Sequence, residues 1–128
     1  ISGAYISSDL VIMPTFPDAW SMESIVLTIE DIQEEVEKWG LSAPSMNIIL
    51  NKYSPLRTSS KEAWDVLIND FKTLILPFQI KESADLQNSI NNGQSIFESK
   101  ASKVVRESIL NLADYICPLT EKEDQLIQ

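Results

Sequence analysis

Three short apolar runs mark out the first 80 residues of the chain, and stretches with helical spacing separate them. The outer two are Leu10–Pro14 and Thr73–Pro77, and the middle one opens the central stretch Met46–Ser54. Each run is too short for a helix and is bounded by proline or polar residues, so the pattern predicts three buried β-strands. Apolar residues between them recur every three or four positions, which predicts helices over Ser21–Trp39 and from about Ser59 to Phe71.

The ends of these two helices carry recognisable signals. Ser21 is a candidate N-cap for the first helix, and Gly40 can adopt the left-handed conformation that ends it. Ser59 and Glu62 have the spacing of a capping box for the second helix. Local sequence is therefore expected to define both helices.

After the third strand the pattern changes to two helices. Ser83 is expected to cap a short helix that Asn92 and Gly93 end. A longer helix is expected from about Lys100 to Cys117, and Pro118 is expected to halt it.

The element order is therefore strand-helix-strand-helix-strand-helix-helix, and the crossovers are long enough for parallel pairing. This predicts an α/β fold, namely half of a doubly wound parallel sheet over residues 1–118, with a polar tail over 119–128. Three strands are few for such a fold, and the apolar inner edge would need further strands to cover it. The opening Ile1–Asp9 carries no helix-capping signal and resembles the end of an interrupted element. We therefore expect a fragment of a larger domain.

Composition excludes several functional classes. The chain has 128 residues, a net charge of -9 and a single cysteine, Cys117. The acidic balance makes a general nucleic-acid or anionic-membrane surface unexpected, although a local basic spot remains open. Because the chain has no histidine, it cannot contain a Ser-His or Cys-His catalytic pair or a histidine metal site.

The candidate chemistry lies at the end of the central strand. In open parallel α/β sheets, ligands bind at the carboxyl ends of the strands. Asn51 is expected there, and its side-chain amide can both donate to and accept from the edge of a purine. The structural alternative is that Asn51 caps a turn through its own backbone.

Four segments in order resemble the carboxyl-terminal half of the ParA/Soj-type partition ATPases, which belong to the deviant Walker A group of P-loop proteins together with MinD. The segments are Ser8–Pro14, Ile48–Tyr53, Leu76–Ser83 and Asn92–Glu98. The resemblance implies an ATPase that uses ATP and Mg²⁺, dimerises around ATP and binds DNA non-specifically. It also implies a centromere-binding partner protein that stimulates hydrolysis, a cytoplasmic, nucleoid-associated location, and a role in plasmid or chromosome partition.

The resemblance assigns roles to two groups of residues. The residues expected to contact the nucleotide base are Asn51, Lys52, Pro77, Phe78 and Ile80. Those expected to contact DNA are Lys81 and Arg57. The family's Gly-rich phosphate loop and its Mg²⁺-positioning motif have no counterpart in this sequence. The chain by itself is therefore expected to contain no catalytic residue, hold no cofactor and be inactive.

The base preference and two alternative functions can also be judged from the sequence. Asn51 and Lys52 open the guanine-specifying Asn-Lys-x-Asp pattern, but Ser54 replaces its aspartate, so adenine is expected. One alternative is a self-contained, non-catalytic flavodoxin-like interaction module, although the acidic residues that such receivers need at strand ends are missing. The other is a MinD-like positioning ATPase, but residues 121–124 are acidic where a basic membrane-binding tail would be needed, so no membrane contact is expected.

Overall fold

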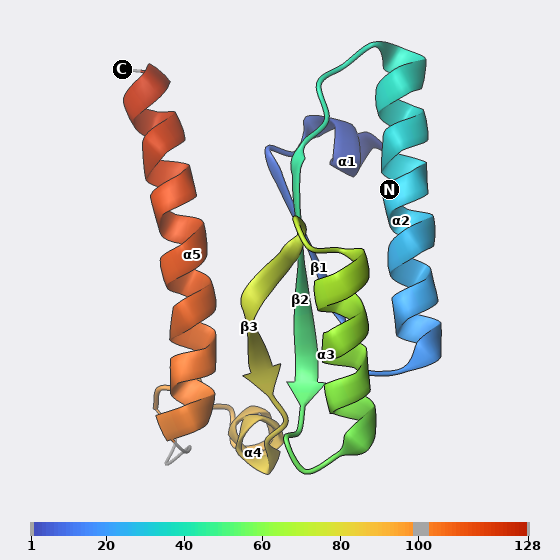
Figure 1. The fold of residues 1–128 in the computed structure, drawn as a ribbon. Coiled ribbons are helices and arrows are strands. Elements are labelled where there is room, and N and C mark those ends of the chain that lie inside the picture. The colour runs from blue at the N-terminus through green and yellow to red at the C-terminus, as the bar shows by residue number, and fades with distance from the viewer. Residues whose placement is uncertain (1, 99–102, 128) are drawn as a thin grey trace. The chain divides into compact units, whose positions relative to one another are not determined.

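A parallel β-sheet with helical crossovers organises the computed structural model, which describes residues 2–98 and 103–127 (Figure 1). The elements in chain order are α1 (Ser2–Ser7), β1 (Leu10–Thr15), α2 (Ala19–Trp39), β2 (Ser45–Tyr53), α3 (Thr58–Asp70), β3 (Ile75–Lys81), α4 (Ala84–Asn91) and α5 (Lys103–Ile127). The chain divides into two compact units, Ile1–Gln79 and Ile80–Gln128. The predicted succession of strands and helices is confirmed, with α1 as an addition.

The sheet has the strand order β1-β2-β3. β1 and β2 are parallel, with Leu10 opposite Ser45 at one end of the ladder and Thr15 opposite Leu50 at the other. Because consecutive parallel strands need a crossover, α2 and α3 lie between them in sequence. This is the α/β arrangement of parallel strands and crossover helices that the hydrophobic pattern predicts.

Pro14 lies inside β1 and does not end the strand, so the predicted boundary is wrong. The carbonyl of Asp9 accepts a hydrogen bond from Ser45 N at 3.1 Å. The backbone N–H and C=O groups of successive residues point to opposite sides of a strand. Those of the odd-numbered residues of β1 therefore point toward β2, and the nitrogen of Pro14 points toward the open edge. A proline nitrogen costs no ladder hydrogen bond there.

β3 also extends beyond its predicted end, from Ile75 to Lys81. Ile48 N donates to the carbonyl of Leu74 at 2.8 Å, which fixes the start of the pairing between β2 and β3. By the same alternation, the nitrogen of Pro77 points away from β2, so the strand can continue through this proline. The prediction that the strand ends at Pro77 is therefore wrong for the same physical reason as at Pro14.

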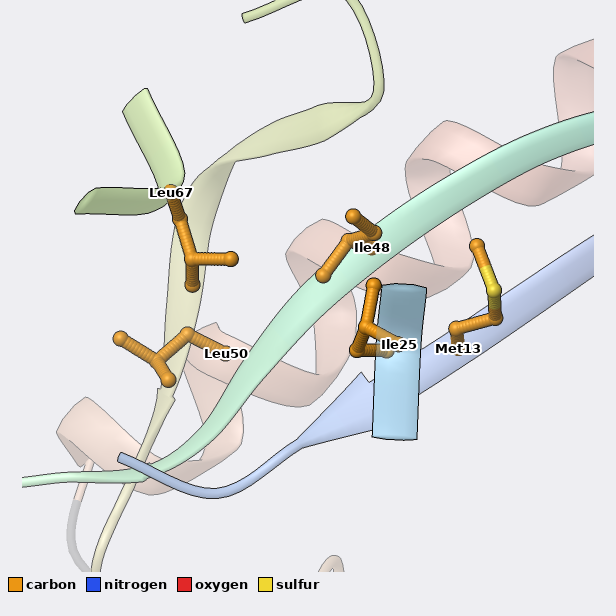
Figure 2. Packing of buried hydrophobic residues seen from close by; sticks show 5 residues of the cluster. All are labelled: Met13, Ile25, Ile48, Leu50 and Leu67. Carbon is orange, nitrogen blue, oxygen red and sulfur yellow. The ribbon is translucent and has the colours of Figure 1, made fainter. Parts of the chain in front are cut away.

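The hydrophobic core of the first unit lies between one face of the sheet and both crossover helices. Its buried members come from β1, α2, β2 and α3, and Figure 2 shows their side chains converging. They are Met13, Ile25, Ile48, Leu50 and Leu67. Since residues of α2 and α3 share one cluster with the strands, the two helices cover the same face of the sheet.

The capping predictions succeed for α2 only in part. Asp18, not Ser21, is the N-cap, and its carboxylate accepts from Ser21 N at 2.7 Å and from Ser21 Oγ at 3.0 Å. Gly40 ends the helix in the left-handed conformation with φ of 61°, as predicted. An aspartate at the N-cap satisfies an orphan N–H and also interacts favourably with the helix dipole.

The predicted capping box of α3 is wrong. The helix begins one residue earlier than Ser59, and its N-cap, Arg57, makes no side-chain capping hydrogen bond. The neighbouring Ser60 is fully buried, and its hydroxyl accepts from Ser54 N at 3.1 Å. A serine that looks like part of a cap in sequence therefore anchors the preceding loop.

In the second unit, the short helix α4 matches its prediction and α5 does not. Ser83 caps α4 by accepting from Asp85 N at 3.0 Å, and Gly93 follows the helix with φ of 65°. α5 continues through Pro118 to Ile127, so the predicted stop is wrong. One proline removes one N–H from a helix, and the following Glu and Lys residues favour helix, so it is expected to bend rather than end the helix. The predicted start near Lys100 lies outside the described residues.

Candidate functional site at the carboxyl ends of the strands

Asn51 lies near the carboxyl end of β2, two residues before Tyr53, in the middle strand of the sheet, and is half-buried. Its Oδ1 accepts a hydrogen bond from the backbone nitrogen of Lys52 at 2.9 Å. Asn51 and Lys52 both lie within β2, so this local contact belongs to the strand and not to the turn predicted as the structural alternative. This bond uses one of the two lone pairs of Oδ1, so the amide can still both donate to and accept from a ligand.

Lys52 has an unusual backbone conformation for its residue type. Its φ is 54°, which makes it the non-glycine residue with a positive φ in the described part of the chain. The side chain is exposed, and Nζ lies 4.7 Å from the centroid of the Phe16 ring. This distance is typical of a cation–π contact.

Phe16 is a site residue that sequence reasoning missed. It follows Thr15, which pairs with Leu50, so the parallel register places Phe16 beside Asn51. Its side chain is 41% exposed. The only signal in the sequence is an aromatic residue directly after a strand, which commonly indicates packing and so attracts no functional interpretation.

The other flank of Asn51 belongs to β3. Ile48 N donates to the carbonyl of Leu74, so in a parallel ladder the residue opposite Ile48 is Ile75. Continuing this register by three residues on each strand brings Phe78 opposite Asn51. Phe78 is half-buried, whereas the preceding Pro77 is exposed. The amide therefore lies between aromatic positions on both neighbouring strands, an arrangement that can hold a flat, partly polar group.

The remaining predicted residues differ in their surroundings. Ile80 and Lys81 belong to the second unit, where Ile80 is buried and Lys81 is half-buried. The base contact expected for the backbone of 78–80 stays a prediction. Arg57 is exposed in the loop before α3. Arg57 belongs to the first unit and Lys81 to the second, so each is described by itself.

The loop after β2 is held against α3. Ser54 N donates to the buried hydroxyl of Ser60, which fixes the position three residues after Asn51. Leu56, two residues further, is 94% exposed. Ser54 is the fourth residue of the sequence pattern Asn-Lys-x-Asp, where guanine-specific proteins have an aspartate.

Two grooves in the first unit lie beside this site and have a different character. The first, of about 380 Å³, lies between β1 and α2. The second, of about 480 Å³, lies between the start of α2 and α3. Asn51 lines neither groove. In the first, the hydroxyls of Ser24 and Thr28 donate to carbonyls of their own helix, so they do not converge on a ligand.

Metal and membrane sites can be judged for the residues that the structure describes. Over 2–98 and 103–127, no three His, Cys, Asp or Glu side chains gather as a metal site would require. Within the same ranges, none of the helices combines the length and the apolar character needed to span a bilayer.

Comparison with known proteins shows a likeness in fold. No family model and no curated protein matches the chain. Solved structures that resemble it include apo McdA from Cyanothece, with a TM-score of 0.61 and 22% sequence identity. The match covers 73% of this chain and 39% of the McdA chain. The chain therefore has a ParA/MinD-like fold, and it spans well under half of the length of that neighbour.

Proposed function

We propose that this chain supplies the base-binding wall of a ParA-like ATPase that acts in plasmid or chromosome partition. The observation that carries the proposal is the half-buried Asn51 near the end of the middle strand, where the strand registers extend to Phe16 on one side and Phe78 on the other. Support comes from the four segments that resemble the partition ATPases and from the fold likeness to McdA, a ParA-like positioning ATPase.

In this proposal the base is adenine. The NH₂ group of Asn51 donates to a ring nitrogen of the purine, and the exposed Pro77 with the backbone of 78–80 lines the other side. Guanine would present its N1–H and exocyclic NH₂ to position 54 and would need paired acceptors there. Ser54 has a neutral hydroxyl, so it cannot supply the charged pair of acceptors that an aspartate offers.

The phosphate chemistry belongs to parts of the parent protein outside this chain. We expect ATP and Mg²⁺ to be held there and the parent to dimerise around ATP. Lys81 and Arg57 are then candidates for non-specific DNA contacts, which would be few and salt-sensitive. The centromere-binding partner protein, the cytoplasmic, nucleoid-associated location and the absence of membrane contact all follow from the same proposal.

A MinD-like positioning ATPase is the second candidate. The likeness to McdA favours it, because McdA is itself a positioning protein. Both candidates need the same adenine site, so mutation of Asn51 does not distinguish them. They differ in what the parent protein positions in the cell. The flavodoxin-like module is the non-enzymatic alternative, and it predicts no nucleotide preference.

The test is competition binding of ATP and GTP to the full-length parent. Asn51→Ala should weaken ATP binding about fivefold to tenfold, in line with one hydrogen bond to the base. Asn69→Ala, which changes an exposed asparagine of α3, is the matched control and should bind as the wild type does. Ser54→Asp should raise the relative affinity for GTP, because it restores the charged acceptor.

Two results would contradict the proposal. One is preferential binding of GTP by the wild-type parent, and the other is unchanged ATP binding in Asn51→Ala. The 128-residue chain alone is expected to bind ATP no better than about millimolar, since a single base contact contributes little without the phosphate contacts. Micromolar binding by this chain would mean that it contains a complete site.

A further inference from the structure

The groove between the start of α2 and α3, with a volume of about 480 Å³, runs between two neighbouring helices. Each helix follows one strand and leads back to the next, so α2 and α3 lie side by side and run in the same direction over one face of the sheet (Figure 1). On α3 the lining residues have the i, i+3, i+4 and i+7 spacing of a single helix face, namely Ser59, Glu62, Ala63 and Val66. A groove with such walls suits a third helix laid along it.

Apolar side chains form most of this groove. Ala19 and Met22 line it from α2, and Ala63 and Val66 line it from α3. Val66 keeps 42% of its side chain exposed, and Trp20, directly after Ala19, keeps 82%. The two alanines are too small to fill the space between the helices, and large exposed aromatic residues are typical of protein interfaces. The first unit therefore leaves apolar surface here that a partner can cover.

Acidic side chains accompany the apolar lining. Asp18 and Glu62 line the groove themselves, and both are exposed. The two helices are acidic as a whole, since α2 carries six carboxylates and one lysine, and α3 carries three carboxylates and one lysine. Such a surface attracts lysine and arginine side chains and repels an anionic partner.

The same charge argues against a second copy of this chain as the occupant. Among the helices that the structure describes, α1 is uncharged and only 6 residues long, and each of the other four has more carboxylates than basic side chains. Any of those four would bring carboxylates against Asp18 and Glu62, and like charges at an interface are costly. The complementary occupant is a helix of another protein, with one apolar face and lysine or arginine beside it.

We propose that the groove between α2 and α3 is a docking site for a basic amphipathic helix of a partner protein. The apolar face of that helix packs on Met22, Ala63 and Val66, and its cationic side chains pair with Asp18 and Glu62. Apolar burial supplies most of the affinity, whereas the charge pairs select the partner and speed its association. This inference goes beyond the proposed function, because the groove does not include Asn51.

The probe is a synthetic peptide of about 15 residues, with leucine at i, i+3, i+4 and i+7 and lysine on the opposite face, so that it can form a basic amphipathic helix. A second peptide carries glutamate in place of every lysine. Each peptide is titrated into the 128-residue chain. The readouts are the dissociation constant and the backbone NMR signals of the residues that line the groove.

Two pairs of variants separate the charge from the apolar contact. Glu62→Lys reverses a charge in the groove, and Glu34→Lys makes the same change in net charge at an exposed position of α2 outside it. Val66→Ser makes the groove more polar, and Val104→Ser is the same substitution at an exposed valine of α5.

We expect the lysine peptide to shift the signals of Ala19, Met22, Ala63 and Val66, and the glutamate peptide to bind at least about tenfold more weakly. Glu62→Lys should weaken binding of the lysine peptide at least about fivefold, and Glu34→Lys less than about twofold. Val66→Ser should weaken it about threefold to fivefold, and Val104→Ser should leave it unchanged. Asn51→Ala should bind the peptide as the wild type does, so a failure of the base-binding proposal would not alter this result.

Four outcomes would overturn the inference. Equal weakening by Glu62→Lys and Glu34→Lys would show that the peptide responds only to overall charge. Unchanged binding in Val66→Ser would show that the apolar lining is not used. If the same NMR signals move with protein concentration in the absence of peptide, the groove is occupied by a second copy. If the polyamine spermine shifts those signals as the peptide does, the groove is a site for small cations.

Discussion

The two crossover helices of the first unit cover the same face of the sheet but are secured in different ways. α2 has an aspartate cap with two hydrogen bonds at its start and a left-handed glycine at its end. α3 has no side-chain cap, and it ends at Phe71 with φ of -123° rather than at a glycine. In their middles the two helices are alike, because each buries a side chain with no exposed surface, Ile32 in α2 and Leu67 in α3.

This difference shows that the limits of a helix can be set by local capping residues or without them. Local signals satisfy the orphan N–H and C=O groups of α2, so its limits are written in neighbouring residues. α3 depends on burial, because hydrophobic packing rather than propensity supplies most helix stability in proteins. Mutations at the helix ends should therefore matter more for α2 than for α3, whereas truncation of a buried side chain should be costly in either helix.

The largest effect is expected for Leu67→Ala. A fully buried leucine truncated to alanine loses transfer free energy and leaves a cavity, which should lower the free energy of unfolding by about 2–5 kcal/mol. Val66→Ala, on the next residue of α3 and 42% exposed, is the control and should cost less than about 1 kcal/mol. Urea unfolding measures both variants. Equal losses would show that α3 does not depend on its buried stripe.

An intermediate effect is expected at the start of α2. Asp18→Ala removes two hydrogen bonds to Ser21 and should lower the free energy of unfolding by about 1 kcal/mol. Glu62→Ala, in the first turns of α3, removes a carboxylate to which the structure gives no capping role and should change stability by less than about 0.5 kcal/mol. The comparison breaks down if urea midpoints show that Glu62→Ala is the more damaging substitution.

The smallest effect is expected at the end of α2. Gly40 has φ of 61°, and a Cβ built there would meet nothing within 4 Å, so Gly40→Ala carries a conformational cost without a clash. The left-handed penalty of about 1–2 kcal/mol is partly offset by the reduced entropy of the unfolded chain, which leaves a loss of about 0.5–1 kcal/mol. Gly3→Ala, without positive φ, should show no such loss in thermal unfolding. A stabilised Gly40→Ala variant would contradict the assigned end of α2.

The candidate site shows how far sequence patterns reach. The position of Asn51 at the exit of the central strand could be predicted because a short apolar run between turn residues has few other interpretations. The role of Phe16 could not, since its approach to Asn51 depends on the register of β1 against β2. Strand pairing joins residues 35 positions apart, and periodicity within either strand carries no information about that register.

Sequence by itself determined the succession of strands and helices, the αL end of α2 and the cap of α4, because each depends on neighbouring residues alone. The tertiary structure decided the rest. Pro14 and Pro77 remain within strands because their nitrogens face away from β2, a fact about sheet order rather than local preference. Lys52 Nζ lies 4.7 Å from the centroid of the Phe16 ring because the pairing of β1 with β2 brings two distant parts of the chain together.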